Sequence, residues 1–225
     1  MSDNDSRPEE MSQFFDARAD SYDAHMRENI DAFEELYRAV AGPIRRSSGP
    51  VSVLDLGCGT GLELEPIFAR VPSAVVTCVD SSKRMLAQLK KKHRSRAGQL
   101  RIVHQSYLSM DLEPSAYDYA VAVMTLHHLL HDTKRELYAR VYEALRPGGL
   151  YIEADYMVSP EREEELLEAY SVQVDELGLH CDGSHHIDIP FSVSTQVALL
   201  AGAGFDEVEV IWRRAEAAVL LARRR

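Results

Sequence analysis

Short apolar runs alternate with helical patterns through the middle of the chain, and this alternation restricts the fold more than any other feature. The runs are rich in β-branched residues and occupy residues 51–56, 74–79, 100–103, 119–123 and 150–154. Uninterrupted runs of this kind are typical of strands buried on both faces of a parallel sheet. Because helical patterns separate the runs, the sequence predicts an α/β fold with a doubly wound, mostly parallel sheet and right-handed crossovers.

The segments on either side of this core depart from the alternation. Helical spacing over residues 10–48 predicts two N-terminal helices joined near residues 23–29, after a flexible tail at 1–9. Residues 161–178 predict a helix whose inward face carries Leu166, Tyr170, Val174 and Leu177. A further helix is expected over 194–203. Strands at 208–212 and 217–221 should then form an antiparallel hairpin through a turn at Arg213 and Arg214.

These segments are expected to form a single domain over residues 1–225. Its core would span 51–155, a helical insertion 156–194, and a closing helix with the edge hairpin 195–225. Inside the core, Thr133 and Glu136 have the spacing of a helix capping box. The run Pro147-Gly148-Gly149 predicts the end of that helix.

Charge and cysteine content narrow the class of protein. The 225 residues carry 25 basic and 36 acidic side chains, a formal net charge of -11. This balance disfavours nucleic acid as a partner, because phosphate binding requires a basic surface. Three cysteines (Cys58, Cys78, Cys181) cannot complete a disulfide framework. With no long apolar run and a polar N-terminus, the sequence predicts a reduced, cytoplasmic protein that does not insert into a membrane. A homo-oligomer remains open.

A glycine-rich loop follows the first apolar run. Gly57, Gly59 and Gly61 stand at alternate positions in Asp55-Leu-Gly-Cys-Gly-Thr-Gly, and a helical pattern begins directly afterwards. Glycine permits positive φ and lets backbone approach a ligand closely. The carboxyl end of a first strand is also where open α/β sheets bind ligands. Leu62 stands where a dinucleotide fingerprint has its third glycine, and the Lys-Ser or Lys-Thr pair of a P-loop is missing.

Two carboxylates indicate the chemistry of the ligand. Asp55 places negative charge beside the loop, which suits a cationic group better than a pyrophosphate. Asp80 ends the second run, about twenty residues after the loop, where a carboxylate accepts hydrogen bonds from both hydroxyls of a ribose. A ribose, a cationic group and no phosphate together describe S-adenosyl-L-methionine.

The chain resembles the class I S-adenosylmethionine-dependent methyltransferases, in their small-molecule form. The resemblance is carried by the glycine loop at 55–61, by Asp80-Ser-Ser with Met85, and by the stretches at 117–129, 145–150 and 203–205. It implies a Rossmann-like, seven-stranded sheet with strand order 3-2-1-4-5-7-6 and an antiparallel seventh strand. It also implies S-adenosyl-L-methionine as cofactor, S-adenosyl-L-homocysteine as product, and a small-molecule acceptor. The core at 51–155 would then bind the cofactor, and the insertion at 156–194 would form a lid over the acceptor.

Matched by position, the resemblance also implies the residues that bind the cofactor. The glycine loop would hold the methionine end, with Tyr22 closing over it, and Asp80 the ribose, with Ser81 and Met85 beside the nucleoside. Ser106 and Tyr107 would meet the adenine, and Met124 would line the pocket beneath it. These residues are Tyr22, Asp55, Gly57, Gly59, Gly61, Asp80, Ser81, Met85, Ser106, Tyr107 and Met124. Ser106 departs from the family, since many members have an aspartate there that accepts a hydrogen bond from the adenine amine.

The proposed reaction is in-line displacement of the sulfonium methyl group by a nucleophile of the acceptor. Catalysis would come mainly from alignment of donor and acceptor. A hydroxyl or ammonium acceptor needs a base, and the candidates are His128, His127 and His25, with His185 and His186 behind them. Asp155 and Tyr156, which end the fifth run, could contact the acceptor.

A metal site is not expected from the sequence. His180, Cys181, His185 and His186 are residue types that bind zinc, but their spacing matches no structural zinc site, and a loop over the acceptor explains them better. Three alternatives to methyl transfer remain open. They are transfer of another group from the same cofactor, a non-catalytic regulatory protein that binds the cofactor, and a nicotinamide dehydrogenase.

Overall fold

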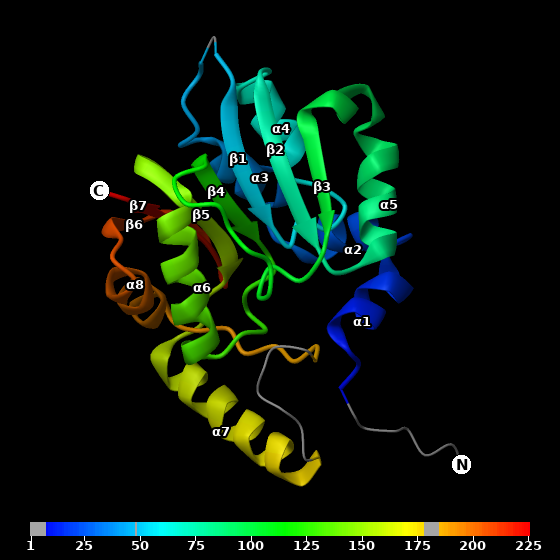
Figure 1. Ribbon diagram of the computed structural model, residues 1–225. Helices are drawn as coiled ribbons and strands as arrows, with labels where there is room; N and C mark the ends of the chain where they lie inside the picture. The colour runs from blue at the N-terminus through cyan, green and yellow to red at the C-terminus, as the bar shows by residue number, and fades with distance from the viewer. Residues whose placement is uncertain (1–7, 48, 178–184) are drawn as a thin grey trace.

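One seven-stranded sheet forms the centre of the protein, in the order β3-β2-β1-β4-β5-β7-β6 (Figure 1). The computed structural model describes residues 8–47, 49–177 and 185–225. The strands are β1 (Val51–Leu56), β2 (Ala74–Asp80), β3 (Leu100–His104), β4 (Tyr117–Val123), β5 (Leu145–Tyr156), β6 (Asp206–Arg214) and β7 (Ala217–Arg223). The β7 strand is antiparallel to both of its neighbours, and the other pairs are parallel. The predicted doubly wound fold and its strand order are confirmed.

Helices cover both faces of this sheet. They are α1 (Met11–Arg18), α2 (Tyr22–Asn29), α3 (Phe33–Ala41), α4 (Leu64–Arg70), α5 (Lys83–Lys92), α6 (His131–Ala144), α7 (Pro160–Leu177), α8 (Val193–Gly202) and the 3₁₀ helix η1 (Arg94–Gln99). Side chains alternate between the faces along β1. Val53 packs in the cluster that contains residues of α3 and α4, and Leu54 and Leu56 pack in the cluster that contains residues of α6 and α8. The central strands are thus buried on both sides.

The N-terminal region contains one more helix than the sequence predicted. Residues 23–29, expected as a joint, belong to α2, and the connections lie on either side of this helix. Met26 is the only buried residue of α2, so this helix carries too little apolar periodicity to stand out in the sequence. The second connection uses Ala32 at a φ of 55°, immediately before α3.

Two predicted boundaries are also wrong. The helix expected to begin at the Thr133 capping box begins at His131, and Leu130 occupies the N-cap without a side-chain hydrogen bond. Arg213 and Arg214 belong to β6, where they pair with Ala218 and Ala217. The turn falls two residues later, at 215–216, because the backbone pairing of β6 with β7 continues through both arginines.

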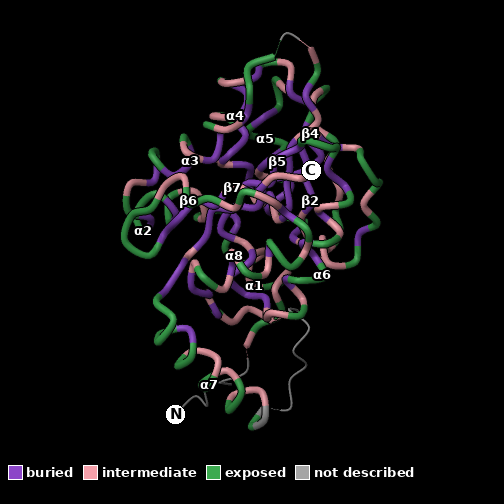
Figure 2. Tube along the Cα trace, turned by 90° about the vertical axis from the view of Figure 1, so that its left-hand side faces the viewer, coloured by how far each residue is buried: buried purple, intermediate pink, exposed green. Residues whose placement is uncertain are grey.

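The α7 helix extends away from the sheet (Figure 2). Its expected inward residues Leu166, Tyr170 and Val174 are only half-buried, and Glu163 is the side chain that is buried. Leu177, the fourth expected residue, has a side chain outside the described part. Glu163 accepts hydrogen bonds from the backbone N–H and hydroxyl groups of the segment before α8 and its first turn, so a polar contact attaches the base of α7. Within the described residues, no helix is long and apolar enough to cross a membrane.

A buried ion pair stabilises the packing of α6 on β5. Lys134 is 1% exposed and its Nζ lies 3.7 Å from Oε1 of Glu153. Glu153 also accepts hydrogen bonds from Tyr138 and Tyr151. We expect Lys134→Ala to lower the free energy of unfolding by about 3 kcal/mol, because it leaves a buried carboxylate without its cation.

Urea unfolding followed by circular dichroism would measure this change. Arg135→Ala is a matched control, since Arg135 pairs with Asp132 on the exposed side of the same helix. That control should change stability by less than about 1 kcal/mol. Equal effects of the two substitutions would contradict the structural role of the buried pair.

Candidate active site

The glycine-rich loop joins β1 to α4 with all three glycines in the left-handed region. Their φ angles are +66° at Gly57, +49° at Gly59 and +73° at Gly61. Asp80, at the end of β2, accepts a hydrogen bond from the Gly59 N–H at 2.8 Å and another from the Ser82 N–H at 2.7 Å. One carboxylate therefore connects the loop after β1 to the start of α5.

The glycines are needed for two different reasons. A Cβ at Gly57 would overlap the Thr125 side chain, so the protein itself, rather than only a ligand, excludes a side chain there. A Cβ at Gly59 would meet only the ring of Tyr22, at 3.9 Å. The loop at Gly59 therefore faces a space whose far side is formed by α2.

Buried acids stand behind this loop. Three buried oxygens have no hydrogen-bond partner among the described residues: both carboxylate oxygens of Asp55 and Oε1 of Glu63. Burial, followed by the charge of Glu63, raises the pKa of Asp55 well above its usual range. Neighbouring carboxyl groups with unpartnered oxygens fit a ligand that brings a cationic group, such as the ammonium of a methionine moiety.

Burial also raises the pKa of Asp80, to about 6. The hydrogen bonds from Ser82 and Gly59 oppose this increase, because they stabilise the ionised carboxylate. Asp80 is therefore ionised at neutral pH and becomes protonated in mildly acidic solution.

The other residues predicted to bind the cofactor lie at the ends of β2, β3 and β4. Ser81 follows Asp80, and Met85 is buried in the first turn of α5. Ser106 caps the turn after β3 by accepting from the Leu108 N–H. Tyr107 donates to the carbonyl of Thr125, and this bond ties the turn to the loop after β4. Met124 begins that loop at a φ of 51°.

The structure adds Asp16 to this region, which sequence reasoning missed. Its carboxylate accepts from the Ser82 hydroxyl at 2.6 Å and from the Arg84 N–H at 3.0 Å. Asp16 thereby fixes α1 over the N-terminus of α5. A lone aspartate in an N-terminal helix has no pattern that could have predicted this contact.

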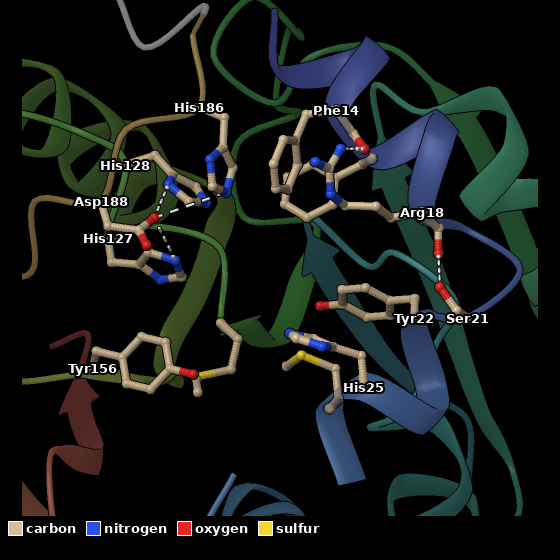
Figure 3. A pocket seen from close by; sticks show the side chains of 13 residues that line it. Phe14, Arg18, Ser21, Tyr22, His25, His127, His128, Tyr156, His186 and Asp188 are labelled. Carbon is tan, nitrogen blue, oxygen red and sulfur yellow. Dashed lines mark hydrogen bonds and ion pairs between the residues drawn. The ribbon is translucent and has the colours of Figure 1, made fainter. Parts of the chain in front are cut away.

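A cavity of about 370 Å³ opens beside Tyr22 and Met124 (Figure 3). Residues from α1, α2, the loop after β4, the end of β5 and the segment before α8 line it. They are Phe14, Phe15, Arg18, Ser21, Tyr22, His25, Met26, Met124, His127, His128, Tyr156, His186 and Asp188. All three histidines predicted as catalytic candidates therefore line one cavity.

His127 is held by the end of β5. Its Nδ1 lies 2.5 Å from Oδ1 of Asp155, and Oδ2 of Asp155 accepts from the Leu126 N–H at 2.9 Å. Burial lowers the pKa of His127, but the Asp155 carboxylate outweighs it and the pKa lies above its usual value. Asp155 thus orients the ring rather than lining the cavity, whereas Tyr156 reaches the cavity directly.

His128 is 4% exposed and lies against His127, with ring centroids 4.0 Å apart. Its Nδ1 is 3.2 Å from the carbonyl oxygen of Ile187 and 3.1 Å from Oδ1 of Asp188. Burial and the neighbouring His127 lower the pKa of His128 to about 4, so the ring is neutral. Its Nε2 has no hydrogen-bond partner in the described part of the chain.

Asp188 is the centre of this group, and the sequence did not indicate it. Besides His128, its Oδ1 faces Nε2 of His127 at 3.7 Å and Nε2 of His186 at 3.8 Å (Figure 3). Hydrogen bonding to His128 lowers the pKa of Asp188 to about 2. A single aspartate sixty residues from the histidine pair carries no signal in the sequence.

The N-terminus closes the cavity from the other side. The ring of His186 stacks on Phe14, with centroids 3.5 Å apart, and the backbone N–H of His186 donates to the carbonyl of Glu9. His25 lies across the cavity from the histidine pair, with its Nδ1 3.1 Å from the Asn29 side chain (Figure 3). His185 forms a backbone bridge with Glu10. His180 and Cys181 lie outside the described residues.

The position of Asp80 leads to a prediction about cofactor affinity. We expect Asp80→Ala to weaken binding of S-adenosyl-L-homocysteine about 10- to 100-fold, since the ribose hydroxyls lose a charged acceptor.

In the unaltered protein the affinity for S-adenosyl-L-homocysteine should be highest above pH 7. It should fall about tenfold by pH 5, because a carboxyl with a pKa of about 6 is then mostly protonated and accepts hydroxyl donors poorly. Calorimetric titrations across this range would measure both effects, and Asp80→Asn should remove the pH dependence. A flat profile in the unaltered protein would exclude Asp80 from the cofactor site.

Comparisons with known proteins agree with this geometry. A family profile described as a methyltransferase domain matches residues 53–149, which include the glycine loop and Asp80. The chain is 26% identical over 181 residues to carboxy-S-adenosyl-L-methionine synthase from Campylobacter hominis, covering 76% of both proteins. It is 29% identical over 131 residues to a malonyl-[acyl-carrier protein] O-methyltransferase from Halalkalibacterium halodurans, covering 58% of this chain and 47% of that protein. The fold is similar to that of a putative O-methyltransferase from Nostoc punctiforme, with a TM-score of 0.72, 17% identity, and coverage of 98% of this chain and 64% of that one.

Proposed function

Because this chain belongs to the class I S-adenosylmethionine-dependent methyltransferases, we propose that it methylates an oxygen nucleophile of a small molecule bound in the cavity beside Tyr22. It is an enzyme that uses S-adenosyl-L-methionine and transfers its methyl group. The acceptor atom and the catalytic residues are the parts of this function that we propose.

The cofactor is placed by the loops after β1, β2 and β3. In this proposal Gly57, Gly59 and Gly61 hold its methionine end, whose ammonium group compensates the unpartnered carboxyl of Asp55. Asp80 accepts the ribose hydroxyls, Ser81 and Met85 flank the nucleoside, and Ser106 and Tyr107 contact the adenine. The sulfonium methyl then lies between Tyr22 and Met124, the two members of this set that line the cavity.

The histidine pair is the observation that carries the choice of an oxygen acceptor. A hydroxyl group must lose its proton as it attacks, and an imidazole that is unprotonated at neutral pH, as that of His128 is, can accept it. In His127 and His128, Nδ1 is bound to a protein oxygen, so the Nε2 atoms remain to accept a proton. Removing the proton at this pair ionises the acceptor next to the methyl group.

The displacement itself needs little further help from the protein. The carbon–oxygen bond to the acceptor forms as the carbon–sulfur bond breaks, and the electron pair stays on sulfur to give S-adenosyl-L-homocysteine. The cavity walls align the acceptor with the methyl group, which contributes on the order of 7–11 kcal/mol in the best cases. His25, across the cavity, is placed to orient the acceptor rather than to ionise it.

The segment over residues 156–194 and the N-terminal helices would act as the lid that selects the acceptor. The contacts of His186 with Phe14 and with Glu9 support this role, since they join the two segments over the cavity. We further propose that the enzyme works in the cytoplasm and does not act on nucleic acid, as its net charge of -11 suggests.

A second candidate function follows from the names of the relatives. The first four of them are carboxy-S-adenosyl-L-methionine synthases, which match 72–90% of this chain. In that case the enzyme would modify the cofactor itself. A carboxylate-bearing reactant needs a cation in the cavity, and Arg18 is the only Lys or Arg among its described lining residues. Because Arg18 already faces Glu9 at 3.3 Å, we favour methyl transfer.

Turnover with S-adenosyl-L-methionine and a panel of small hydroxylated, phenolic and carboxylated compounds would test the proposal. We expect S-adenosyl-L-homocysteine to accumulate, and mass spectrometry to show one added methyl group on the acceptor. A carboxylated cofactor would establish the second candidate instead. Tight cofactor binding with no turnover on the whole panel would favour a non-catalytic protein.

A further inference from the structure

The cavity contains more unshared nitrogen and oxygen lone pairs than a set of hydrogen-bonded histidines requires. The Nδ1 of His128 faces two oxygens that only accept hydrogen bonds, the carbonyl oxygen of Ile187 at 3.2 Å and Oδ1 of the Asp188 carboxylate at 3.1 Å. One nitrogen supplies at most one hydrogen, so lone pairs of these oxygens are left without a donor. The bond from Nδ1 of His127 to Asp155 leaves the Nε2 of that ring facing Asp188.

The same atoms are arranged as ligands of one ion. One ligand atom each from His127, His128 and Asp188 lies within 4.8 Å of the other two. Bonds of about 2.0–2.1 Å in tetrahedral geometry place neighbouring ligand atoms about 3.4 Å apart. The observed separation of 3.7 Å between Nε2 of His127 and Oδ1 of Asp188 is therefore close to that of two ligands on a shared metal.

The atom behind the ring of His127 supports the same conclusion. Histidines that bind metals almost always donate their other ring N–H to a carboxylate or a backbone carbonyl, which fixes the ring and its tautomer. His127 has the carboxylate of Asp155 at Nδ1 in this position, while its Nε2 faces Asp188. Asp188 is 60% exposed on the cavity side, which leaves room for further ligands.

We propose that His127, His128 and Asp188 bind a divalent first-row transition-metal cation whose open coordination positions face the acceptor. Two imidazoles and one carboxylate form a donor set that suits such ions. The inference rests on the proposed function and changes one step of it: the histidine pair would act through the cation, which would bind the acceptor oxygen and lower its pKa, so that its proton is lost to water before methyl transfer instead of passing to an imidazole. It also differs from the sequence-based expectation, which considered only the histidines and the cysteine at 180–186.

Metal binding can be measured without any turnover. We expect the metal-free protein to bind one Zn²⁺ in a calorimetric titration, and Co²⁺ to give a visible spectrum. Asp188→Asn should weaken Zn²⁺ binding at least about tenfold, as should Asp155→Asn, which withdraws the carboxylate behind His127. Asp132→Asn replaces an exposed aspartate of α6 outside the cavity and should bind Zn²⁺ like the unaltered protein.

The possible outcomes distinguish failure of the metal inference from failure of the proposed function. Lack of stoichiometric Zn²⁺ binding, or equal binding by Asp188→Asn, would overturn the metal site. So would binding that is lost in Cys181→Ser and kept in Asp188→Asn, because the ion would then lie elsewhere. If the protein treated with a chelator retains full methyl transfer, the metal inference fails and the proposed function stands. If Zn²⁺ binds at Asp188 but S-adenosyl-L-homocysteine does not bind, the proposed function fails instead.

Discussion

Replacing Gly57 by alanine should weaken binding of S-adenosyl-L-homocysteine by about 1,000-fold. Two costs combine at this position. A residue with a Cβ at a φ of +66° is strained by about 1–3 kcal/mol. The new methyl group would also overlap the Thr125 side chain, and forcing extra atoms into a packed site costs about 1–3 kcal/mol. If the loop moves to relieve the strain and the overlap, it leaves the conformation that holds the cofactor. The two costs add up to about 4 kcal/mol, which corresponds to a 1,000-fold loss of affinity.

Three variants separate the two costs. Gly148→Ala introduces the strain alone, since Gly148 has a φ of +78° and open space around it. Gly98→Ala introduces neither, and both controls should bind the cofactor normally. Adding Thr125→Gly to Gly57→Ala should recover part of the lost affinity, because it removes the atoms that the new methyl group overlaps. Normal binding by a folded Gly57→Ala protein would contradict the placement of the cofactor at this loop.

The second large effect is expected at His128. We expect His128→Ala to lower kcat by about 10²–10⁴-fold, with little change in the KM for the acceptor or in the affinity for S-adenosyl-L-homocysteine. The group that ionises the acceptor would be lost, whereas the loops that bind the cofactor lie after β1, β2 and β3. Steady-state kinetics with the acceptor found in the panel, together with a cofactor titration, would measure the three quantities.

Two other histidines provide the controls. His131→Ala removes a histidine that stacks on Phe191 and pairs with Glu163 outside the cavity, so kcat should not change. His25→Ala removes the candidate on the opposite wall, and the loss should be smaller than for His128. Thermal unfolding would show whether each variant is folded. If His25→Ala inactivates the enzyme and His128→Ala does not, the acceptor is ionised on the side of α2.

Much of the fold could be predicted because it depends on local patterns. The apolar runs predicted the five strands from β1 to β5, and the family resemblance implied the strand order that the structure confirms. Errors arose where a local pattern was weak or where backbone pairing overrode it. The α2 helix buries one side chain, and Arg213 and Arg214 remain in β6 because their pairing with β7 continues.

The cofactor-binding part of the site could be predicted from the sequence to a greater extent than the acceptor cavity. The glycine loop and Asp80 lie at ends of adjacent parallel strands, so a motif and a topology were enough to bring them together. Their roles remain predictions. The partners of the histidine pair come from other places in the chain: Asp155 from the end of β5 and Asp188 from the segment before α8.

By itself the sequence determined the α/β scaffold, the glycine loop and the acid that follows β2, because periodicity and short motifs act between near neighbours. Only the tertiary structure decided that His127, His128 and Asp188 face one another and that Thr125 excludes a side chain at Gly57. Such contacts join residues far apart in the chain, and they depend on how loops from separate strands pack at one edge of the sheet. The chemistry of the acceptor belongs to this second group, since that edge forms the wall of its cavity.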